Sequence, residues 1–227
     1  IACSYSGNTE ETIQAFHAAR KTKAKIVCVT SGGVLSALAK THHCDLITIP
    51  SGMPPRACLG YSFVQLLFIL KKAGLLKTNF EKEILEGIQH INKERTQIQK
   101  SAHKIATSLT DKEIAIYTIA GREALAIRFR QQLNENSKVL AWHNVIPEMT
   151  HNEIVGWTNN HSSVAAIFCY HPDDYDRNLK RLKILQGVVK KYCANVVTMV
   201  LKGDSYWEKA IYFIHLTDWI SVFLADL

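Results

Sequence analysis

The stretch Ser4-Tyr5-Ser6-Gly7-Asn8-Thr9-Glu10-Glu11-Thr12 follows directly after a short apolar run, Ile1–Cys3. Gly7 permits a tight turn, and Asn8 with Glu11 three residues later is typical of a capping box at the start of a helix. An apolar strand, a glycine turn and a helix start in this order predict the first repeating unit of an α/β fold.

The same alternation continues along the chain. Short apolar runs rich in β-branched residues predict strands at Ile1–Cys3, Lys25–Val29, Leu46–Ile49, Glu113–Ile119, Val139–Val145, Val164–Tyr170 and Val196–Leu201. Longer amphipathic stretches predict helices at Thr9–Lys21, Val34–Thr41, Ala57–Ala73, Arg122–Leu133, Asn152–Trp157, Asp174–Tyr192 and Tyr206–Leu227. This order predicts an α/β fold in which parallel sheets are covered by helices on both faces.

Residues 79–109 interrupt the alternation. Apolar residues recur there at helical spacing among Glu, Lys, Gln and Arg, which predicts one long helix or two helices. We therefore expect two similar α/β halves, residues 1–78 and 110–227, joined by a helical connector over 79–109. The chain opens without Met inside an apolar run and stops inside a helical pattern, so missing sequence is expected on both sides.

Composition narrows the class of partner. The net charge of +7 over 227 residues favours anionic partners such as phosphate esters, and it fits a mildly basic enzyme of the cytoplasm equally well. The sequence has no Lys/Arg-rich run of the kind that predicts nucleic-acid binding. Six cysteines without a C-x-x-C pair indicate reduced core thiols and a cytoplasmic location. The apolar segment Ala210–Leu227 carries His215, Asp218 and Asp226, so we expect a core helix and no membrane contact.

The hydroxyls of Ser4, Ser6 and Thr9 gather where a helix N-terminus presents free N–H groups. Such donors, without a metal, suit a phosphate monoester. The alternative is a plain Ser/Thr cap, which is common at helix starts. Three hydroxyls together with Gly7 and Asn8 within six residues favour the anion site.

This loop resembles the phosphosugar loop of sugar-isomerase (SIS) domains, which are parallel α/β domains that bind phosphorylated sugars. Two further stretches narrow the resemblance: Pro50-Ser-Gly-Met-Pro-Pro-Arg56-Ala-Cys-Leu-Gly-Tyr61, and Asn134-Glu135-Asn136 followed by Pro147-Glu-Met-Thr-His151-Asn-Glu-Ile-Val-Gly-Trp157. In this order they are similar to the bifunctional phosphoglucose/phosphomannose isomerase family, along essentially the whole chain. The resemblance implies two SIS-type subdomains, a phosphorylated hexose as substrate, and no metal or other cofactor.

The resemblance also assigns residue roles. It matches Ser4, Ser6 and Thr9 to phosphate-binding hydroxyls, and Arg56 to the arginine that approaches the sugar. It matches Glu135 to the base that moves a proton between C1 and C2, and His151 to the acid that opens the sugar ring. In the family this histidine comes from the neighbouring subunit, which implies a homodimer with shared active sites. By local sequence alone, Arg56 is equally well a surface residue, and Glu135 and His151 are polar loop residues.

The chain departs from the family pattern in three places. A Gly-Ser loop that also holds the sugar phosphate would lie before Ile1, and a catalytic lysine would lie after Leu227. Tyr175 stands where the family has His, and we assign it no role.

Two other functions are compatible with an SIS-type domain. A phosphosugar-binding module without chemistry is disfavoured by the pair Glu135 and His151. An amidotransferase isomerase half would need Lys-His-Gly-Pro, where this chain has Thr-His-Asn-Glu.

Overall fold

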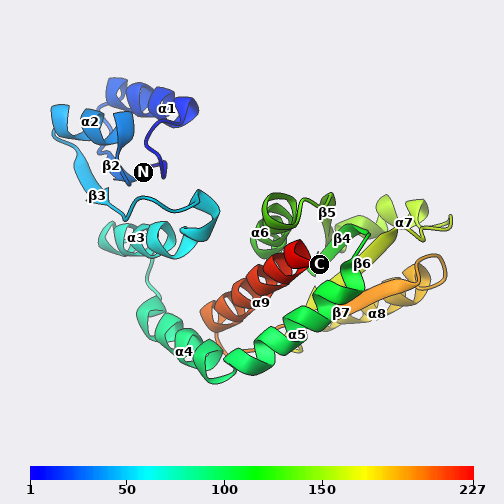
Figure 1. Ribbon diagram of the computed structural model, residues 1–227. Coiled ribbons are helices and arrows are strands. Elements are labelled where there is room, and N and C mark those ends of the chain that lie inside the picture. The colour runs from blue at the N-terminus through cyan, green and yellow to red at the C-terminus, as the bar shows by residue number, and fades with distance from the viewer. The chain divides into compact units, whose positions relative to one another are not determined.

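Three short strands form a parallel sheet in the N-terminal part of the computed structural model, which describes all of residues 1–227 (Figure 1). The strands run in the order β1-β2-β3 and comprise β1 (Ala2–Cys3), β2 (Val27–Thr30) and β3 (Asp45–Thr48). The helices of this part are α1 (Glu10–Lys21), α2 (Gly33–Thr41) and α3 (Leu59–Lys72), and a 3₁₀ turn covers Pro55–Ala57. These elements make one unit, residues 1–78.

The core of this unit lies between the sheet and helices α1 and α2. Phe16 of α1 and Leu35 of α2 are buried against Cys28 of β2. Helix α3 contacts β2 as well. Each side chain comes from an apolar position that recurs at helical or strand spacing, so burial of these stripes accounts for the packing.

Two loops approach each other closely at the turn after β1, and this approach fixes the backbone conformation of the turn. Gly7 has a φ of 72°, its carbonyl accepts from the amide of Leu35 (2.8 Å), and a Cβ at this position would overlap the carbonyl oxygen of Gly32. Only glycine combines this left-handed backbone with so close a neighbour. The turn that carries Ser4, Ser6 and Thr9 is therefore held against the turn before α2.

The capping box predicted at Asn8 and Glu11 is wrong. Helix α1 begins after Thr9, whose side chain makes no cap hydrogen bond, and Asn8 Oδ1 instead accepts from the amide of Val34 (3.0 Å). Asn8 thus satisfies a free N–H at the start of the next helix, α2. A capping box does form further along the chain, between Ser205 and Glu208.

Residues 79–227 form the second unit. Its parallel sheet has the order β5-β4-β6-β7, with β4 (Glu113–Ile119), β5 (Ala141–Ile146), β6 (Val164–Tyr170) and β7 (Asn195–Val200). Its helices are α4 (Phe80–Lys93), α5 (Arg95–Leu109), α6 (Glu123–Gln132), α7 (Glu153–Gly156), α8 (Asp176–Val189) and α9 (Tyr206–Asp226). The segment 79–109 is thus two helices that break at Glu94, and both pack on α9 within this unit.

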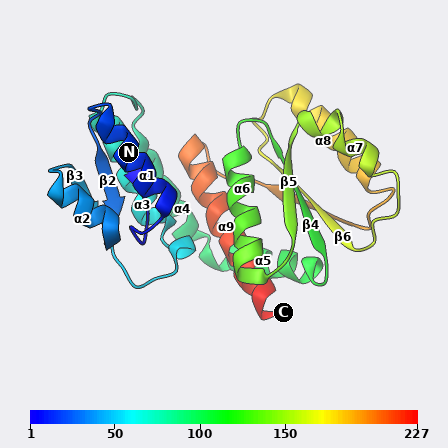
Figure 2. The same ribbon diagram turned by 90° about the horizontal axis from the view of Figure 1, so that it is seen from above.

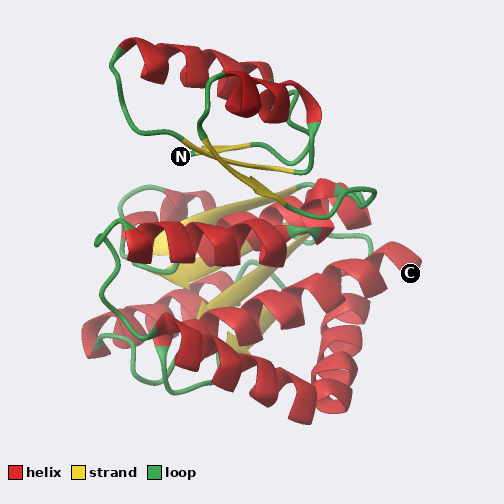
Figure 3. Cartoon of the chain, turned by 90° about the vertical axis from the view of Figure 1, so that its left-hand side faces the viewer, coloured by secondary structure: helices red, strands yellow, loops and turns green.

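Helices cover both faces of this sheet, as the parallel α/β fold predicted from the sequence requires (Figures 2 and 3). Ile114 and Ile116 of β4 face α5, α6 and α9, whereas Ala115 and Tyr117 face the side of α8. Because β4 and β6 are buried on both faces, they have continuous apolar sequences. None of the helices combines the length and the apolar character that a membrane-spanning helix requires.

We predict that Gly7→Ala lowers the free energy of unfolding of the first unit by about 2–5 kcal/mol. The substitution places an alanine in the left-handed backbone region, and its Cβ overlaps the carbonyl oxygen of Gly32. Thermal and urea unfolding measure the loss. Gly60→Ala is the matched control, since a Cβ at Gly60 meets no atom within 4 Å. It should change stability by less than about 1 kcal/mol. Equal effects of the two substitutions would refute the close approach at Gly7.

Candidate functional site

The turn between β1 and α1 brings two of the predicted hydroxyls together. Ser4 Oγ and Thr9 Oγ1 share a hydrogen bond of 2.8 Å, and Ser4 Oγ also accepts from the amide of Gly7 (3.1 Å). Ser6 Oγ, in the same turn, accepts from the amide of Asn8 (3.2 Å). Ser4 is 6% exposed, while Ser6 and Thr9 are exposed. The hydroxyls therefore line a fixed turn of which one side is open to solvent.

The start of α1 adds backbone donors to this turn. The amide of Ile13 is the first to bond within the helix, to the carbonyl of Thr9 (3.0 Å), and the Thr9 side chain makes no cap hydrogen bond. Amides before Ile13 have no partner within a helix of this kind, and they carry the positive end of the helix dipole. Hydroxyl and amide donors at one turn can bind the oxygens of a phosphate group.

Tyr5 connects this turn to the segment that carries Arg56. The hydroxyl of Tyr5 accepts from the amide of Met53 (3.1 Å), and the Tyr5 carbonyl accepts from Ser31 Oγ (2.6 Å). Arg56 is half-buried in the 3₁₀ turn Pro55–Ala57, three residues after Met53. The first unit thus holds the segment of Arg56 beside the turn of Ser4.

Glu135 lies in a π-helical turn, residues 133–137, that extends α6. The polar side chains beside it form hydrogen bonds. Asn136 Nδ2 donates to Ser221 Oγ (2.9 Å), and Ser137 Oγ donates to the carbonyl of Ser221 (2.8 Å). Asn134 Nδ2 donates to the carbonyl of Val139 (2.8 Å). The side chain of Glu135 is exposed. Turns of this kind are frequent at functional sites, and here α9 fixes the backbone that presents the carboxylate.

His151 lies at the end of the 3₁₀ turn Glu148–Thr150 that follows β5. Its amide donates to the carbonyl of Glu148 (3.0 Å), and the hydroxyl of Thr150 donates to the carbonyl of Pro147 (2.5 Å). The residue is exposed. The fold therefore presents the imidazole to solvent from a turn held by local hydrogen bonds.

The second unit does not bring Glu135 and His151 together. The turn of Glu135 packs on α6 and α9 and precedes β5, whereas the turn of His151 follows β5 and continues into α7 on the opposite face. The six residues of β5 span about 20 Å. Because the sheet lies between the two turns, both side chains cannot contact one small substrate within a single chain.

A partly buried hydrogen-bond network adjoins the turn of His151. The carboxylate of Glu153 accepts from the hydroxyl of Tyr117 (2.6 Å), from Trp142 Nε1 (2.8 Å) and from Asn144 Nδ2 (2.7 Å). The hydroxyl of Tyr117 accepts in turn from Trp157 Nε1 (2.8 Å). Burial, and then the charge of Glu153, raise the pKa of Tyr117, so the phenol stays protonated and donates. Sequence reasoning missed this network, although Glu153 directly follows His151-Asn152.

The carboxyl ends of β4 and β6 carry an internal ion cluster. Arg122 donates to Asp174 through Nε (2.9 Å) and Nη2 (2.6 Å), and Asp174 also accepts from the amide of His171 (2.7 Å). Burial, with the charge of Lys209, lowers the pKa of His171. Chain order reverses between these strands, and ligands commonly bind at such a point in α/β sheets. Here the guanidinium is already occupied by a carboxylate of its own chain.

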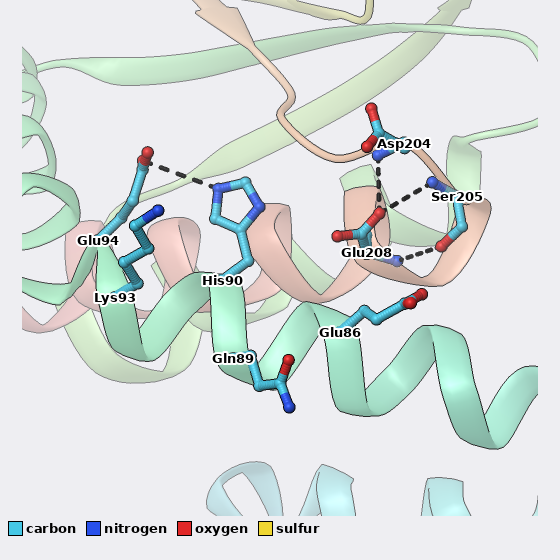
Figure 4. A pocket seen from close by; sticks show the side chains of 8 residues that line it. All are labelled: Glu86, Gln89, His90, Lys93, Glu94, Asp204, Ser205 and Glu208. Atoms are coloured by element: carbon cyan, nitrogen blue, oxygen red, sulfur yellow. Dashed lines mark hydrogen bonds and ion pairs between the residues drawn. The ribbon is translucent and has the colours of Figure 1, made fainter.

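A cavity of ≈ 480 Å³ between α4 and the start of α9 contains none of the predicted residues. It is lined by Glu86, Gln89, His90, Lys93, Glu94, Asp204, Ser205 and Glu208 (Figure 4). Glu208 accepts from the amides of Asp204 (2.8 Å) and Ser205 (3.1 Å), which caps α9. The hydrogen bond from Lys202 lowers the pKa of Glu94. The bond between Glu94 and Lys202 therefore joins the end of α4 to the β7–α9 turn, whereas Glu208 bonds within that turn.

No group of three or more His, Cys, Asp or Glu residues has an arrangement that could hold a metal ion. In the sequence His151-Asn152-Glu153, the amide of Glu153 donates to Asn152 Oδ1 (2.6 Å), and its carboxylate accepts from Tyr117.

Several solved structures share this architecture. The chain matches the C-terminal domain of glucosamine-fructose-6-phosphate aminotransferase from Francisella tularensis with a TM-score of 0.71 at 17% identity, over 99% of this chain and 69% of that one. It matches the tagatose-6-phosphate ketose/aldose isomerase from Escherichia coli with a TM-score of 0.66 at 12% identity, over 99% and 66%. At these identities the likeness concerns the fold.

Residues 98–227 match the family model described as bacterial phospho-glucose isomerase C-terminal SIS domain. The chain is 37% identical to the bifunctional phosphoglucose/phosphomannose isomerase of Caldicellulosiruptor bescii, over all of this chain and 70% of that protein. It is 34% identical to the protein of the same name from Aquifex aeolicus, over 99% and 68%. The chain belongs to the bifunctional phosphoglucose/phosphomannose isomerase family of SIS-domain proteins.

We predict that Ser221→Ala loosens the turn of Glu135, because the Ser221 hydroxyl accepts from Asn136. The free energy of unfolding should fall by about 0.5–1.5 kcal/mol, the usual net contribution of one hydrogen bond. Amide hydrogen exchange across residues 133–138 should accelerate. Ser108→Ala is the control, since the Ser108 hydroxyl only donates within its own helix, to Ile105 (2.7 Å). Unchanged exchange in the Ser221 variant would show that α9 does not hold this turn.

Proposed function

We propose that this protein interconverts glucose 6-phosphate and mannose 6-phosphate with fructose 6-phosphate through a cis-enediol. The observation that carries the proposal is its similarity, along the whole chain, to proteins named bifunctional phosphoglucose/phosphomannose isomerase. The turn after β1, where the hydroxyls of Ser4 and Thr9 meet at the start of a helix, supports a phosphorylated substrate. Such sugars are metabolites of the cytoplasm, and six free cysteines fit that location.

In this proposal Ser4, Ser6 and Thr9 hold the phosphate, with the amides at the start of α1. Arg56 donates hydrogen bonds to sugar hydroxyls and stabilises the negative charge of the enediolate. Its segment is tied to the phosphate-binding turn through Tyr5, which supports a common task.

Glu135 acts as the base of the reaction. Its carboxylate removes a proton from one of the carbons C1 and C2 and returns it to the other, so no net proton is consumed. His151 acts as an acid that protonates the ring oxygen while the hydroxyl at the anomeric carbon loses its proton, which gives the open-chain sugar. Imidazole suits this role because its ordinary pKa lies near neutral pH.

The protein acts as a homodimer with shared active sites. Within one chain Glu135 and His151 lie on opposite faces of the sheet, which supports a site that takes His151 from the partner copy. A two-fold dimer supplies two such sites, each with one base and one acid.

The phosphate site is tested by the double substitution Ser4→Ala/Thr9→Ala. It should weaken binding of fructose 6-phosphate by roughly 2–4 kcal/mol, because two hydrogen bonds to a charged group are lost. Isothermal titration calorimetry measures the change. Thr22→Ala, at the far end of α1, is the control and should bind as the unmodified protein does. Unchanged affinity in the double variant would remove the phosphate from this turn.

The base is tested by Glu135→Gln, which keeps the shape of the side chain but cannot accept a proton from carbon. We expect kcat to fall at least about 100-fold while the affinity for fructose 6-phosphate stays nearly constant. Exchange of solvent deuterium into C2 of the aldose products, followed by proton NMR, reports the proton transfer itself. Exchange at the unmodified rate would assign the base to another residue.

The shared site is tested by mixing Glu135→Gln protein with His151→Ala protein. Each variant alone lacks one group in every site, but a mixed dimer has one site with both groups. Activity should therefore return on mixing, towards about one quarter of the unmodified level if the subunits pair at random. No recovery, under conditions in which native mass spectrometry detects mixed dimers, would place both groups in one chain.

A further inference from the structure

The carboxylate of Glu153 has an unusually complete set of donors. Oε1 accepts from the hydroxyl of Tyr117 and from Trp142 Nε1, and Oε2 accepts from Asn144 Nδ2. These three donors come from β4 and β5, whereas Glu153 is the first residue of α7. The side chain therefore joins the short helix to two strands of the sheet.

The network requires an ionised carboxylate. All three partners donate, and burial with the neighbouring charge keeps the Tyr117 phenol protonated. The hydroxyl of Tyr117 already accepts from Trp157 Nε1, so the direction of its own hydrogen bond is fixed towards Glu153. Hydrogen bonds to a charged acceptor are stronger than neutral ones. A glutamine amide at position 153 would bring its own N–H groups against a donor.

The network also joins the two ends of the segment that carries His151. Asn144 lies near the end of β5 and Glu153 at the start of α7, so their hydrogen bond ties residues 144 and 153 together. His151 lies two residues before Glu153, and no hydrogen bond inside the chain holds its exposed ring. The position of the His151 ring therefore depends on the backbone of the turn that carries it.

We propose that Glu153 is a positioning residue, which fixes the turn of His151 so that the imidazole meets the ring oxygen of the substrate. The inference rests on the proposed isomerase function. Ring opening needs the acid within hydrogen-bond reach of one oxygen atom, and a displacement of about 1 Å can cost about 100-fold in rate. Proton transfer by Glu135, in a turn held by α9, does not depend on this network.

The test is Glu153→Gln in the full-length protein, assayed on two ketose substrates. Fructose 6-phosphate must open its ring, whereas 5-deoxyfructose 6-phosphate lacks the ring-forming hydroxyl and is always open. We expect kcat on fructose 6-phosphate to fall by about 10- to 100-fold and kcat on the deoxy substrate to change less than about 3-fold. Glu148→Gln removes the same charge from an exposed side chain three residues before His151, and it should leave both rates unchanged.

A complementing substitution separates positioning from loss of fold. In Asn144→Asp/Glu153→Gln, the new carboxylate at 144 accepts from the new amide at 153, so the tie between β5 and α7 is restored. The double variant should recover at least about one third of the rate on fructose 6-phosphate and slow hydrogen exchange in residues 147–153, even if Glu153→Gln alone folds poorly.

Three results would overturn the inference. They are an unchanged rate in Glu153→Gln, an equal loss on both substrates, and a double variant that is no better than Glu153→Gln. Failure of the proposed function gives a different result, because the unmodified protein would then not convert fructose 6-phosphate at all.

Discussion

Burial of α9 is the constraint on which the second unit depends. The apolar side chains of this 21-residue helix, among them Phe213, Leu216 and Ile220, pack with α5, α6 and one face of the sheet in a single core. The same helix carries polar anchors between its apolar residues. Asp218 accepts from Arg128 (2.7 Å) and Gln132 (3.0 Å) of α6, and Ser221 holds the turn of Glu135. Packing of one helix thus determines where the proposed base is presented.

The opposite face of the sheet supports the proposed acid by a different means. There a charged carboxylate, Glu153, is satisfied by donors from two strands, and a short helix of four residues is held in place by that network. A helix this short has little stability of its own. The two proposed catalytic groups are therefore fixed independently, one by apolar packing and one by a polar network, on opposite sides of one sheet.

Much of this fold is predictable from sequence because the apolar patterns are strong. Strands β4 and β6 have the predicted bounds, since their runs are buried on both faces. The ends of elements are less well predicted. The helix predicted to end at Leu133 continues into a π turn, because Asn136 and Ser137 bond to Ser221 of α9, which lies 85 and 84 residues further along the chain. The role of Asn8 was missed for the same reason: its partner, Val34, is distant in sequence.

In the candidate site, too, contacts between residues close in sequence are predictable and contacts between distant residues are not. Ser4 and Thr9 are close in sequence, so their pairing at a helix start could be predicted from local spacing. The roles of Glu153 and Ser221 could not be predicted from local spacing, because their hydrogen-bond partners lie on other strands and helices. No local pattern distinguishes these two residues from ordinary polar residues. A resemblance to known sequences assigns roles to Glu135 and His151, but only the fold shows that a sheet separates them.

The proposed function depends first on the binding of a phosphorylated sugar at the turn after β1. The most direct measurement is a titration of ¹⁵N-labelled protein with glucose 6-phosphate, followed by two-dimensional amide NMR, with unphosphorylated glucose as the reference. We expect saturable shifts of the amides from Ser4 to Thr12 with the phosphorylated sugar and none with glucose. Shifts confined to other residues, or equal shifts with both sugars, would contradict it.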